Sequence, residues 1–87
     1  MSAEANGKGG TPAAVLAYLA SQIVEDQDAV RIDVEETANG VTLRLHVAPD
    51  DMGKVIGKRG RVAQSIRTLV RAAGARDGIG VFVDIVD

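Results

Sequence analysis

The sequence predicts an α+β domain of two layers, in which helices pack on one face of a three-stranded mixed sheet. Apolar and polar residues alternate in "VRIDVEE" (30–36), "VTLRLHV" (41–47) and "GVFVDIVD" (80–87), as is typical of half-buried strands. Apolar residues recur at helical spacing once before the first strand and twice between the second strand and the third. The expected order of elements is therefore α-β-β-α-α-β.

Composition limits both the size of the fold and its chemistry. The 87 residues suffice for one domain, and 46% apolar with 25% charged residues is an ordinary globular balance. Cysteine is absent and the one histidine, His46, is expected on the surface of a strand, so a metal site or a nucleophilic triad is hard to assemble. No signal peptide or membrane-spanning segment is recognisable. We therefore expect a cytoplasmic protein that is not an enzyme and needs no metal or other cofactor.

The first predicted helix follows a short tail. Residues 1–10 are polar and rich in glycine, which indicates a flexible N-terminal tail before a domain of residues 11–87. Thr11 followed by Pro12 is typical of a helix start, with the hydroxyl as N-cap and the proline at the first helical position. Apolar residues at helical spacing then predict a helix over residues 12–24.

Turn and cap signals place the remaining elements. Asn39-Gly40 predicts a hairpin between the first two strands, because both residues tolerate positive φ. Asp50 or Asp51 is expected to cap a short helix, "DMGKVI". A longer helix follows, with Gly74 at its C′ position and an apolar face of Val62, Ile66, Leu69, Val70 and Ala73. Since two helices connect the second strand to the third, these strands are expected to be parallel neighbours joined by a right-handed crossover.

Positive charge is concentrated in one segment, although the net charge of the chain is −2. Residues 51–76 contain a single acid, Asp51, whereas the rest of the chain is acidic. The cations of this segment are Lys54, Lys58, Arg59, Arg61, Arg67, Arg71 and Arg76. A local field of one sign, rather than the total charge, attracts a charged ligand, so we expect an anionic partner here.

The tetrad Gly57-Lys58-Arg59-Gly60 lies between the last two predicted helices and is the strongest candidate for an anion site. Gly57 can adopt the left-handed conformation that ends the first of these helices, and Gly60 lets the chain enter the second. The helix beginning near Arg61 is expected to direct unpaired N–H groups and the positive end of its dipole toward the tetrad. With Lys58 and Arg59 at the tip, the pattern predicts a phosphate-binding loop.

Spacing excludes two common phosphate-binding loops. A Walker A loop needs four residues between its glycines, followed by Lys and then Ser or Thr. Here three residues separate Gly53 from Gly57, and Arg59 stands at the hydroxyl position. A dinucleotide fingerprint needs G-x-G-x-x-G directly after a strand, but a predicted helix precedes Gly57. A loop between two helices, with cations continuing along the second, suits an extended sugar–phosphate backbone instead.

The segment "VIGKRGRVAQSI" (55–66) resembles the core of a KH domain, in which a G-x-x-G loop clamps about four nucleotides of a single strand. The α-β-β-α-α-β order is similar to the type II, bacterial arrangement of that family. The resemblance covers roughly residues 12–87, nearly the whole chain. It is greatest to the small bacterial RNA-binding members that consist of a single KH domain, and it implies a type II KH fold.

The resemblance also implies a set of RNA-contacting residues. The tetrad would hold the phosphates, and Gly53 would let a base lie close to the backbone of the short helix. Val55, Ile56 and Val62 would belong to or border an apolar floor, although some of them must also face the core. Ala63 stands where many KH domains carry Ile or Leu. The complete expected set is Gly53, Lys54, Val55, Ile56, Gly57, Lys58, Arg59, Gly60, Arg61 and Val62.

A cellular function follows from the resemblance as an expectation. The protein would be an RNA chaperone or post-transcriptional regulator that acts with a second KH protein and affects cell shape, cell-wall biogenesis and envelope homeostasis. Tyr18 and Phe82 are the two aromatic residues, so little stacking on bases is expected and affinity per domain would be roughly micromolar. A homodimer or a second RNA-binding subunit would then raise the affinity through effective concentration.

Two other functions stay open at this point. The predicted helix over residues 61–73 could serve as a recognition helix for duplex DNA, although a glycine pair provides no base-edge readout. Alternatively, the domain mediates contacts between proteins and its nucleic-acid surface is degenerate, although the loop keeps both cations. Arg67, Arg71 and Arg76 fit either contact with RNA or simple solvation of an outward helix face.

Overall fold

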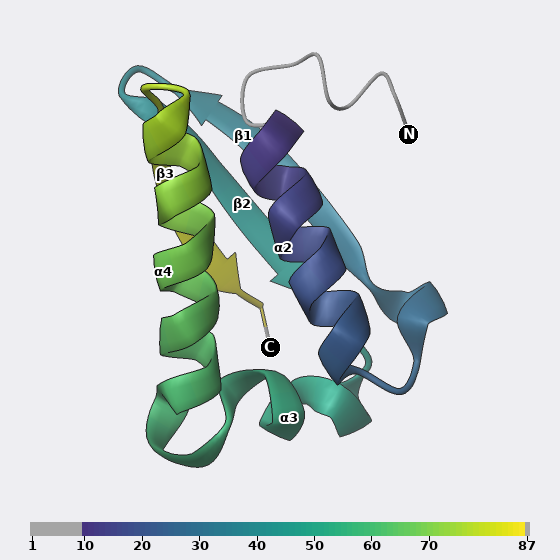
Figure 1. Cartoon of the computed structure of the whole chain (residues 1–87). Coiled ribbons are helices and arrows are strands. Elements are labelled where there is room, and N and C mark those ends of the chain that lie inside the picture. Colours follow the sequence, from purple (N-terminus) through teal and green to yellow (C-terminus); the bar gives the residue numbers. More distant parts are fainter. Residues whose placement is uncertain (1–9, 87) are drawn as a thin grey trace.

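The computed structural model describes residues 10–86, and its elements follow the predicted order (Figure 1). The helices are α2 (Gly10–Ile23), α3 (Met52–Ile56) and α4 (Arg61–Arg76), and the strands are β1 (Arg31–Thr37), β2 (Gly40–His46) and β3 (Gly80–Ile85). Short 3-10 turns lie between them: η1 (Gln27–Ala29), η2 (Pro49–Asp51) and η3 (Lys58–Gly60). The predicted tail, residues 1–10, lies outside the described residues except for Gly10. The α+β class is confirmed.

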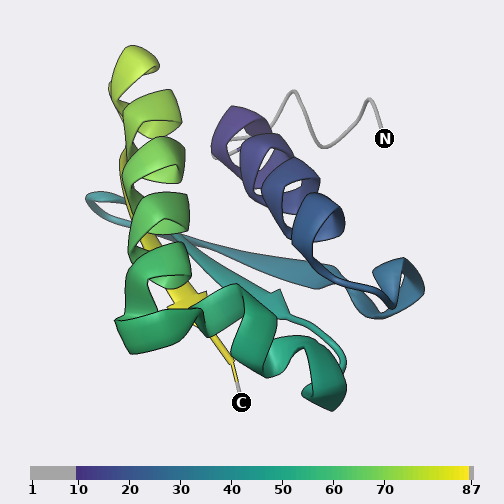
Figure 2. The same cartoon turned by 60° about the horizontal axis from the view of Figure 1, so that its bottom comes forward.

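The sheet has the strand order β1-β2-β3. β1 and β2 form an antiparallel hairpin, whereas β2 and β3 are parallel because the connection through α3 and α4 returns the chain to the same end of the sheet. α2 and α4 lie over one face of this sheet, and α3 lies beside the end of α2 (Figures 1 and 2). The predicted mixed sheet with helices on one face is therefore confirmed. The α3–α4 connection lies at the opposite end of the molecule from the β1–β2 turn (Figure 1).

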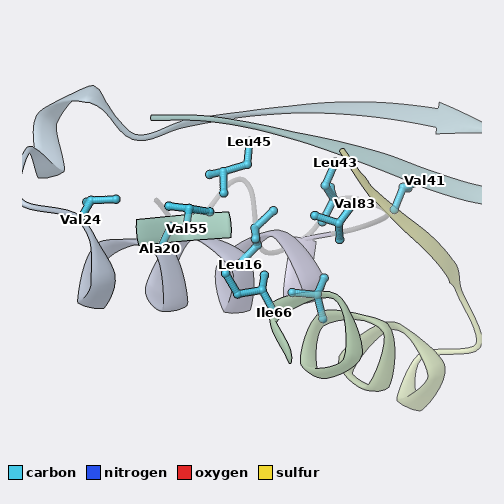
Figure 3. Close-up of a cluster of buried hydrophobic side chains, with 10 residues drawn as sticks. Leu16, Ala20, Val24, Val41, Leu43, Leu45, Val55, Ile66 and Val83 are labelled. Carbon is cyan, nitrogen blue, oxygen red and sulfur yellow. The ribbon is translucent and has the colours of Figure 1, made fainter. Parts of the chain in front are cut away.

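The core lies between the sheet and the helices and is aliphatic (Figure 3). Leu43 and Leu45 of the central strand β2 have no exposed surface. The other elements contribute further fully buried side chains, Leu16 of α2, Val55 of α3, Val70 of α4 and Val83 of β3. Burying each such side chain contributes about 1.5–3 kcal/mol. Aliphatic packing thus holds all three helices on the sheet, and both aromatic side chains are exposed.

The hairpin is confirmed, but its turn lies one residue earlier than Asn39-Gly40. Thr37 and Gly40 are paired, so Ala38 and Asn39 form the two-residue link. Gly40, at φ 156°, is already the first residue of β2 and faces Gly80 of β3. A Cβ on Gly40 would collide with the carbonyl oxygen of Gly80. The glycine is therefore required by the close approach of two strands as well as by its backbone angle.

Two helix ends differ from the predictions. α2 begins at Gly10, so Thr11 lies inside its first turn instead of capping it. α4 continues past Gly74 to Arg76, and Gly74 is buried inside the helix where a Cβ would collide with the side chain of Val81. The left-handed residue beyond the helix is Gly78, at φ 71°. A glycine expected to end the helix therefore allows α4 to approach β3 closely.

The predicted core face of α4 is wrong at Leu69, whose side chain is 52% exposed. The buried residues of this helix are Ala63, Ile66, Val70 and Gly74. This stripe recurs at spacings of three and four residues and excludes Leu69, which lies on the adjacent outward face. Val34 is 47% exposed although it alternates correctly, because β1 is an edge strand that the helices cover incompletely.

Candidate nucleic-acid interface

The connection between α3 and α4 is a tight turn of residues 57–60, called the GKRG loop below. α3 ends where the amide of Gly57 donates to the carbonyl of Gly53 at 2.8 Å. Gly57 has φ 75°, and a Cβ there would collide with the side chain of Val62, so both angle and space require glycine. Gly60 has φ 73° in open space, so only the backbone angle requires it.

Arg59 also adopts a left-handed conformation, with φ 58° and ψ 25°. It is the only non-glycine residue with positive φ among residues 10–86. Such a conformation costs an L-residue roughly 1–2 kcal/mol, so the surrounding turn must impose it. Lys58 and Arg59 are both exposed. The loop therefore holds two cations in a defined backbone shape at the surface.

The start of α4 is partly satisfied by the loop itself. No side chain caps the helix at Gly60. However, the amide of Gly60 donates to the carbonyl of Gly57 at 3.1 Å, and the amide of Arg61 donates to that of Lys58. The prediction of unpaired amides at this junction is therefore wrong for Gly60 and Arg61, because the η3 turn uses their N–H groups. Attraction for an anion then comes from the exposed cations and from the positive end of the α4 dipole.

A hollow of about 400 Å³ lies beside the GKRG loop. Its lining consists of Lys58, Arg59, Arg61 and Val62. We call Lys58, Arg59 and Arg61 the loop cations. None of the three forms a salt bridge with another residue of the range 10–86, whereas the sheet cation Arg44 is paired with Glu35 at 2.7 Å. The hollow thus combines unpaired positive charge with an aliphatic side chain, which suits a nucleotide.

A second hollow, of about 510 Å³, continues along α4. Its lining consists of Arg61, Gln64, Ser65, Thr68 and Leu69. Arg61 belongs to both hollows, so the two surfaces are continuous. The sequence does not single out Gln64, because an exposed amide on a helix gives no recognisable signal by itself.

The predicted site residues of α3 separate into exposed and buried positions. Gly53 is exposed, and a Cβ there would meet no atom within 4 Å. Ile56 is half-buried and lies near the loop. Val55 has no exposed surface and belongs to the core, so its prediction as part of the binding floor is wrong. Successive helix residues point about 100° apart, so α3 cannot present all of these positions to one ligand.

Lys54, another predicted RNA contact, lies in a group of acids. Its ammonium is 2.8 Å from a carboxylate oxygen of Glu25 and 3.6 Å from one of Asp51. The hydrogen bond to Glu25 raises the pKa of Lys54. The charge of Lys54 is therefore engaged at the end of α2, whereas the loop cations are not engaged in this way.

Asp51 has a different role from the predicted helix cap. It stands at the N-cap position of α3 but makes no side-chain hydrogen bond there. Its carboxylate instead accepts the backbone amides of Asp26 at 3.1 Å and Glu25 at 3.2 Å, just beyond α2. These two hydrogen bonds, with Lys54, lower the pKa of Asp51. No local pattern in the sequence indicates these partners, because they lie 25 and 26 residues earlier in the chain.

Other residues that the sequence singled out lie away from the loop or support the fold. Arg67 donates from Nε to the carbonyl of Val83 at 3.2 Å, on strand β3. Ala63 is buried, so it shapes the packing under α4 and not the binding surface. His46 contacts Asp33 at 2.9 Å on the sheet and lies on the surface as expected. Within residues 10–86, no helix combines the length and apolar character needed to span a bilayer, and no three potential metal ligands cluster.

The arrangement as a whole identifies the class of protein. Two helices joined by a G-x-x-G loop, packed on a three-stranded mixed sheet in the order α-β-β-α-α-β, define a type II KH domain. The profile of the family described as KhpA/KhpB, KH domain, matches residues 13–85. The chain belongs to this family, which is not a family of enzymes.

Named relatives cover most of the chain. "RNA-binding protein KhpA" of Mycobacterium bovis is 47% identical over 70 residues, which span 80% of this chain and 84% of that protein. The protein of the same name from Caldanaerobacter subterraneus subsp. tengcongensis is 46% identical over 68 residues, 78% of this chain and 91% of that protein. The Streptomyces coelicolor protein is 44% identical over 72 residues, 83% and 87% of the two chains.

Proposed function

We propose that the chain binds single-stranded RNA and that the GKRG loop clamps the RNA backbone. The observation that carries this proposal is the pair of exposed cations, Lys58 and Arg59, on a tight glycine turn beside a partly apolar hollow. The shared name of the relatives, RNA-binding protein KhpA, supports RNA as the nucleic acid. The function is therefore binding without catalysis.

Phosphates and bases bind to different parts of this surface. The loop cations neutralise phosphates where the positive end of the α4 dipole adds to the field. Val62 in the hollow and the half-buried Ile56 offer aliphatic contacts to a base, and Gly53 lets the base approach the backbone of α3. Because these contacts span a short stretch, about four nucleotides bind per domain.

Charge reversal in the loop tests the proposal. Replacing Lys58 and Arg59 by Asp should lower the affinity for a short single-stranded RNA by more than about 100-fold, because two charge-assisted contacts of about 1.5–3 kcal/mol each are lost. Thermal unfolding should change little, since both side chains are exposed. Fluorescence anisotropy of a labelled oligonucleotide measures the affinity.

The matched control is Arg71→Asp with Arg76→Asp. It makes the same change in net charge at exposed positions of α4 that lie roughly 15 Å or more from the helix start. A much smaller loss of affinity is expected. An equal loss would show general attraction in place of a clamp. Tighter binding to duplex DNA than to single-stranded RNA would favour a recognition helix. Unchanged RNA affinity in both variants would contradict the clamp, and no RNA binding by the wild-type chain would favour a protein-interaction domain.

The partner and the cellular role extend this proposal. We infer that a KhpB-like KH protein or a second copy of the chain adds a second RNA-binding surface, because the matching family includes both KhpA and KhpB. Sedimentation of the chain alone and with such a partner, with and without RNA, tests the assembly.

We place the complex in the cytoplasm as an RNA chaperone or post-transcriptional regulator that affects cell shape and cell-wall biogenesis. A deletion strain should regain its shape with the wild-type chain and not with the Lys58→Asp, Arg59→Asp variant.

A further inference from the structure

Asp51 is the one buried polar or charged residue among residues 10–86, with 2% of its surface exposed. Both carboxylate oxygens are used, Oδ1 by the amide of Glu25 and Oδ2 by the amide of Asp26. These amides belong to the second and third residues after the end of α2 at Ile23. A buried carboxylate is retained at low cost only when such donors compensate its lost hydration.

The hydrogen bonds of Asp51 connect two elements that are distant in sequence. Asp51 stands immediately before α3, and Lys54 of the same helix reaches back to Glu25 at 2.8 Å. One carboxylate, one ammonium and two backbone amides thus join the start of α3 to the end of α2. Figure 1 shows these two ends next to each other.

α3 needs such an anchor because it is short. A helix of five residues has little stability of its own, so tertiary contacts decide where it lies. Val55 fixes one face of α3 in the core, and Asp51 fixes its first residue. The GKRG loop begins directly after this helix, at Gly57. The position of the loop therefore depends on both contacts.

We propose that Asp51 is a positioning residue for RNA binding: its buried carboxylate holds α3, and with it the GKRG loop, in the geometry that the RNA backbone requires. This inference rests on the proposed function of the loop. Asp51 does not contact the RNA, and its effect passes through the placement of α3.

The sign of the effect separates positioning from simple electrostatics. An acid near a polyanion repels it, so neutralising that acid tightens binding if only charge matters. Removing an anchor has the opposite effect, because the fraction of molecules with a correctly placed loop decreases and the apparent affinity decreases with it. Asp51→Asn removes the charge at nearly constant size and leaves one acceptor oxygen for two amides.

The experiment compares Asp51→Asn with Asp50→Asn, which neutralises the exposed neighbouring acid. Affinity for a single-stranded RNA is measured at a temperature at which every variant is fully folded. Asp51→Asn should bind about tenfold more weakly, the effect expected if one charge-assisted hydrogen bond is lost from the anchored state. Asp50→Asn should bind equally well or more tightly. Equal or tighter binding by Asp51→Asn would overturn the proposal.

General destabilisation is controlled with Val41→Ala. Val41 is buried at the end of the core opposite Val24 and Val55 (Figure 3), so its truncation lowers the melting temperature without touching α3. This variant should keep wild-type RNA affinity. A loss of affinity in Val41→Ala equal to that in Asp51→Asn would overturn the proposal, because stability alone would then explain both.

Amide hydrogen exchange without RNA gives a second readout. In the wild-type chain the amides of Gly57 and Gly60 are hydrogen-bonded to Gly53 and Gly57. Asp51→Asn should accelerate exchange at these amides more than at the β2 amides, whereas Val41→Ala should not. Unchanged loop exchange in Asp51→Asn would contradict the anchor. If the wild-type chain does not bind RNA at all, the proposed function fails, and the exchange measurement still decides whether Asp51 holds the loop.

Discussion

At the scale of single residues, the three glycines in and before the GKRG loop differ in whether and why a side chain is excluded at their positions. Gly57 combines positive φ with close contact to Val62, so two independent constraints exclude a side chain. Gly60 has the positive φ without the contact. Gly53 has neither constraint, because it is exposed on α3 and a Cβ there would meet no atom within 4 Å. The fold does not require a glycine at position 53, which supports the proposed approach of a base to α3.

Alanine substitution at two glycines separates these reasons. Gly53→Ala should raise the stability of the folded chain by about 0.5–1 kcal/mol, since alanine favours helix, yet weaken RNA binding because the Cβ meets the base. Gly57→Ala should lower the melting temperature, because the Cβ meets Val62 and the backbone angle is unfavourable. Thermal unfolding and RNA titration of both variants check this. Unchanged RNA affinity in Gly53→Ala would mean that no base lies against α3.

At the scale of elements, the α3–loop–α4 unit separates two kinds of cation. Lys54 on α3 is paired with Glu25 and Asp51 and serves the contact between α3 and α2. Arg61 at the start of α4 is exposed and lines both hollows. Because both residues lie close to the GKRG loop in sequence, both were predicted to contact RNA. Their positions on different helices give them different partners: Lys54 pairs with acids, and Arg61 faces the two hollows.

Salt dependence distinguishes these cations. For three or four neutralised phosphates on a single strand, the slope of log K against log salt should be about −2 to −3. Arg61→Gln should make this slope shallower by about 0.7, the value of one phosphate contact on a single strand. Lys54→Gln should leave the slope unchanged, because its charge is engaged by acids. Equal changes in slope for both variants would contradict this assignment.

At the scale of the whole molecule, tertiary contacts couple stability to pH. Hydrogen bonds from the amides of Asp26 and Glu25 lower the pKa of Asp51 below its ordinary value of 3.8, and the hydrogen bond to His46 lowers that of Asp33. The unfolded chain then binds more protons than the folded chain in the window below the ordinary value. The resulting stabilisation is complete above the unfolded pKa and is lost as pH falls through the lower folded pKa.

Urea unfolding at several pH values between about 7 and about 3 measures this coupling. The wild-type chain should lose stability toward the acid end of this range. Asp51→Asn should lose less stability over the same range, because it lacks the Asp51 carboxylate, whose pKa is lowered in the folded chain. A pH dependence identical to that of the wild type would show that the Asp51 hydrogen bonds do not form in solution.

The sequence by itself determined the class of fold, the order of elements, the β1–β2 hairpin and the position of the G-x-x-G loop. These features are local, because alternation, helical spacing and turn chemistry are set by residues a few positions apart. The loop cations were recognisable for the same reason. A predicted helix boundary differed from the observed one where a glycine has another structural role. Gly74 was expected to end the helix, but it lies inside α4 and allows close packing against Val81.

Only the tertiary structure decided which apolar residues are covered and which charges are engaged. Leu69 fits the helical period of the core face and is exposed, and Val55 fits the family's binding floor and is buried. Asp51 resembles a cap for its own helix and binds amides 25 and 26 residues away. Burial depends on which neighbouring element covers a face, and an ion pair depends on what the fold brings within reach. Both are relations between distant segments, which no local pattern contains.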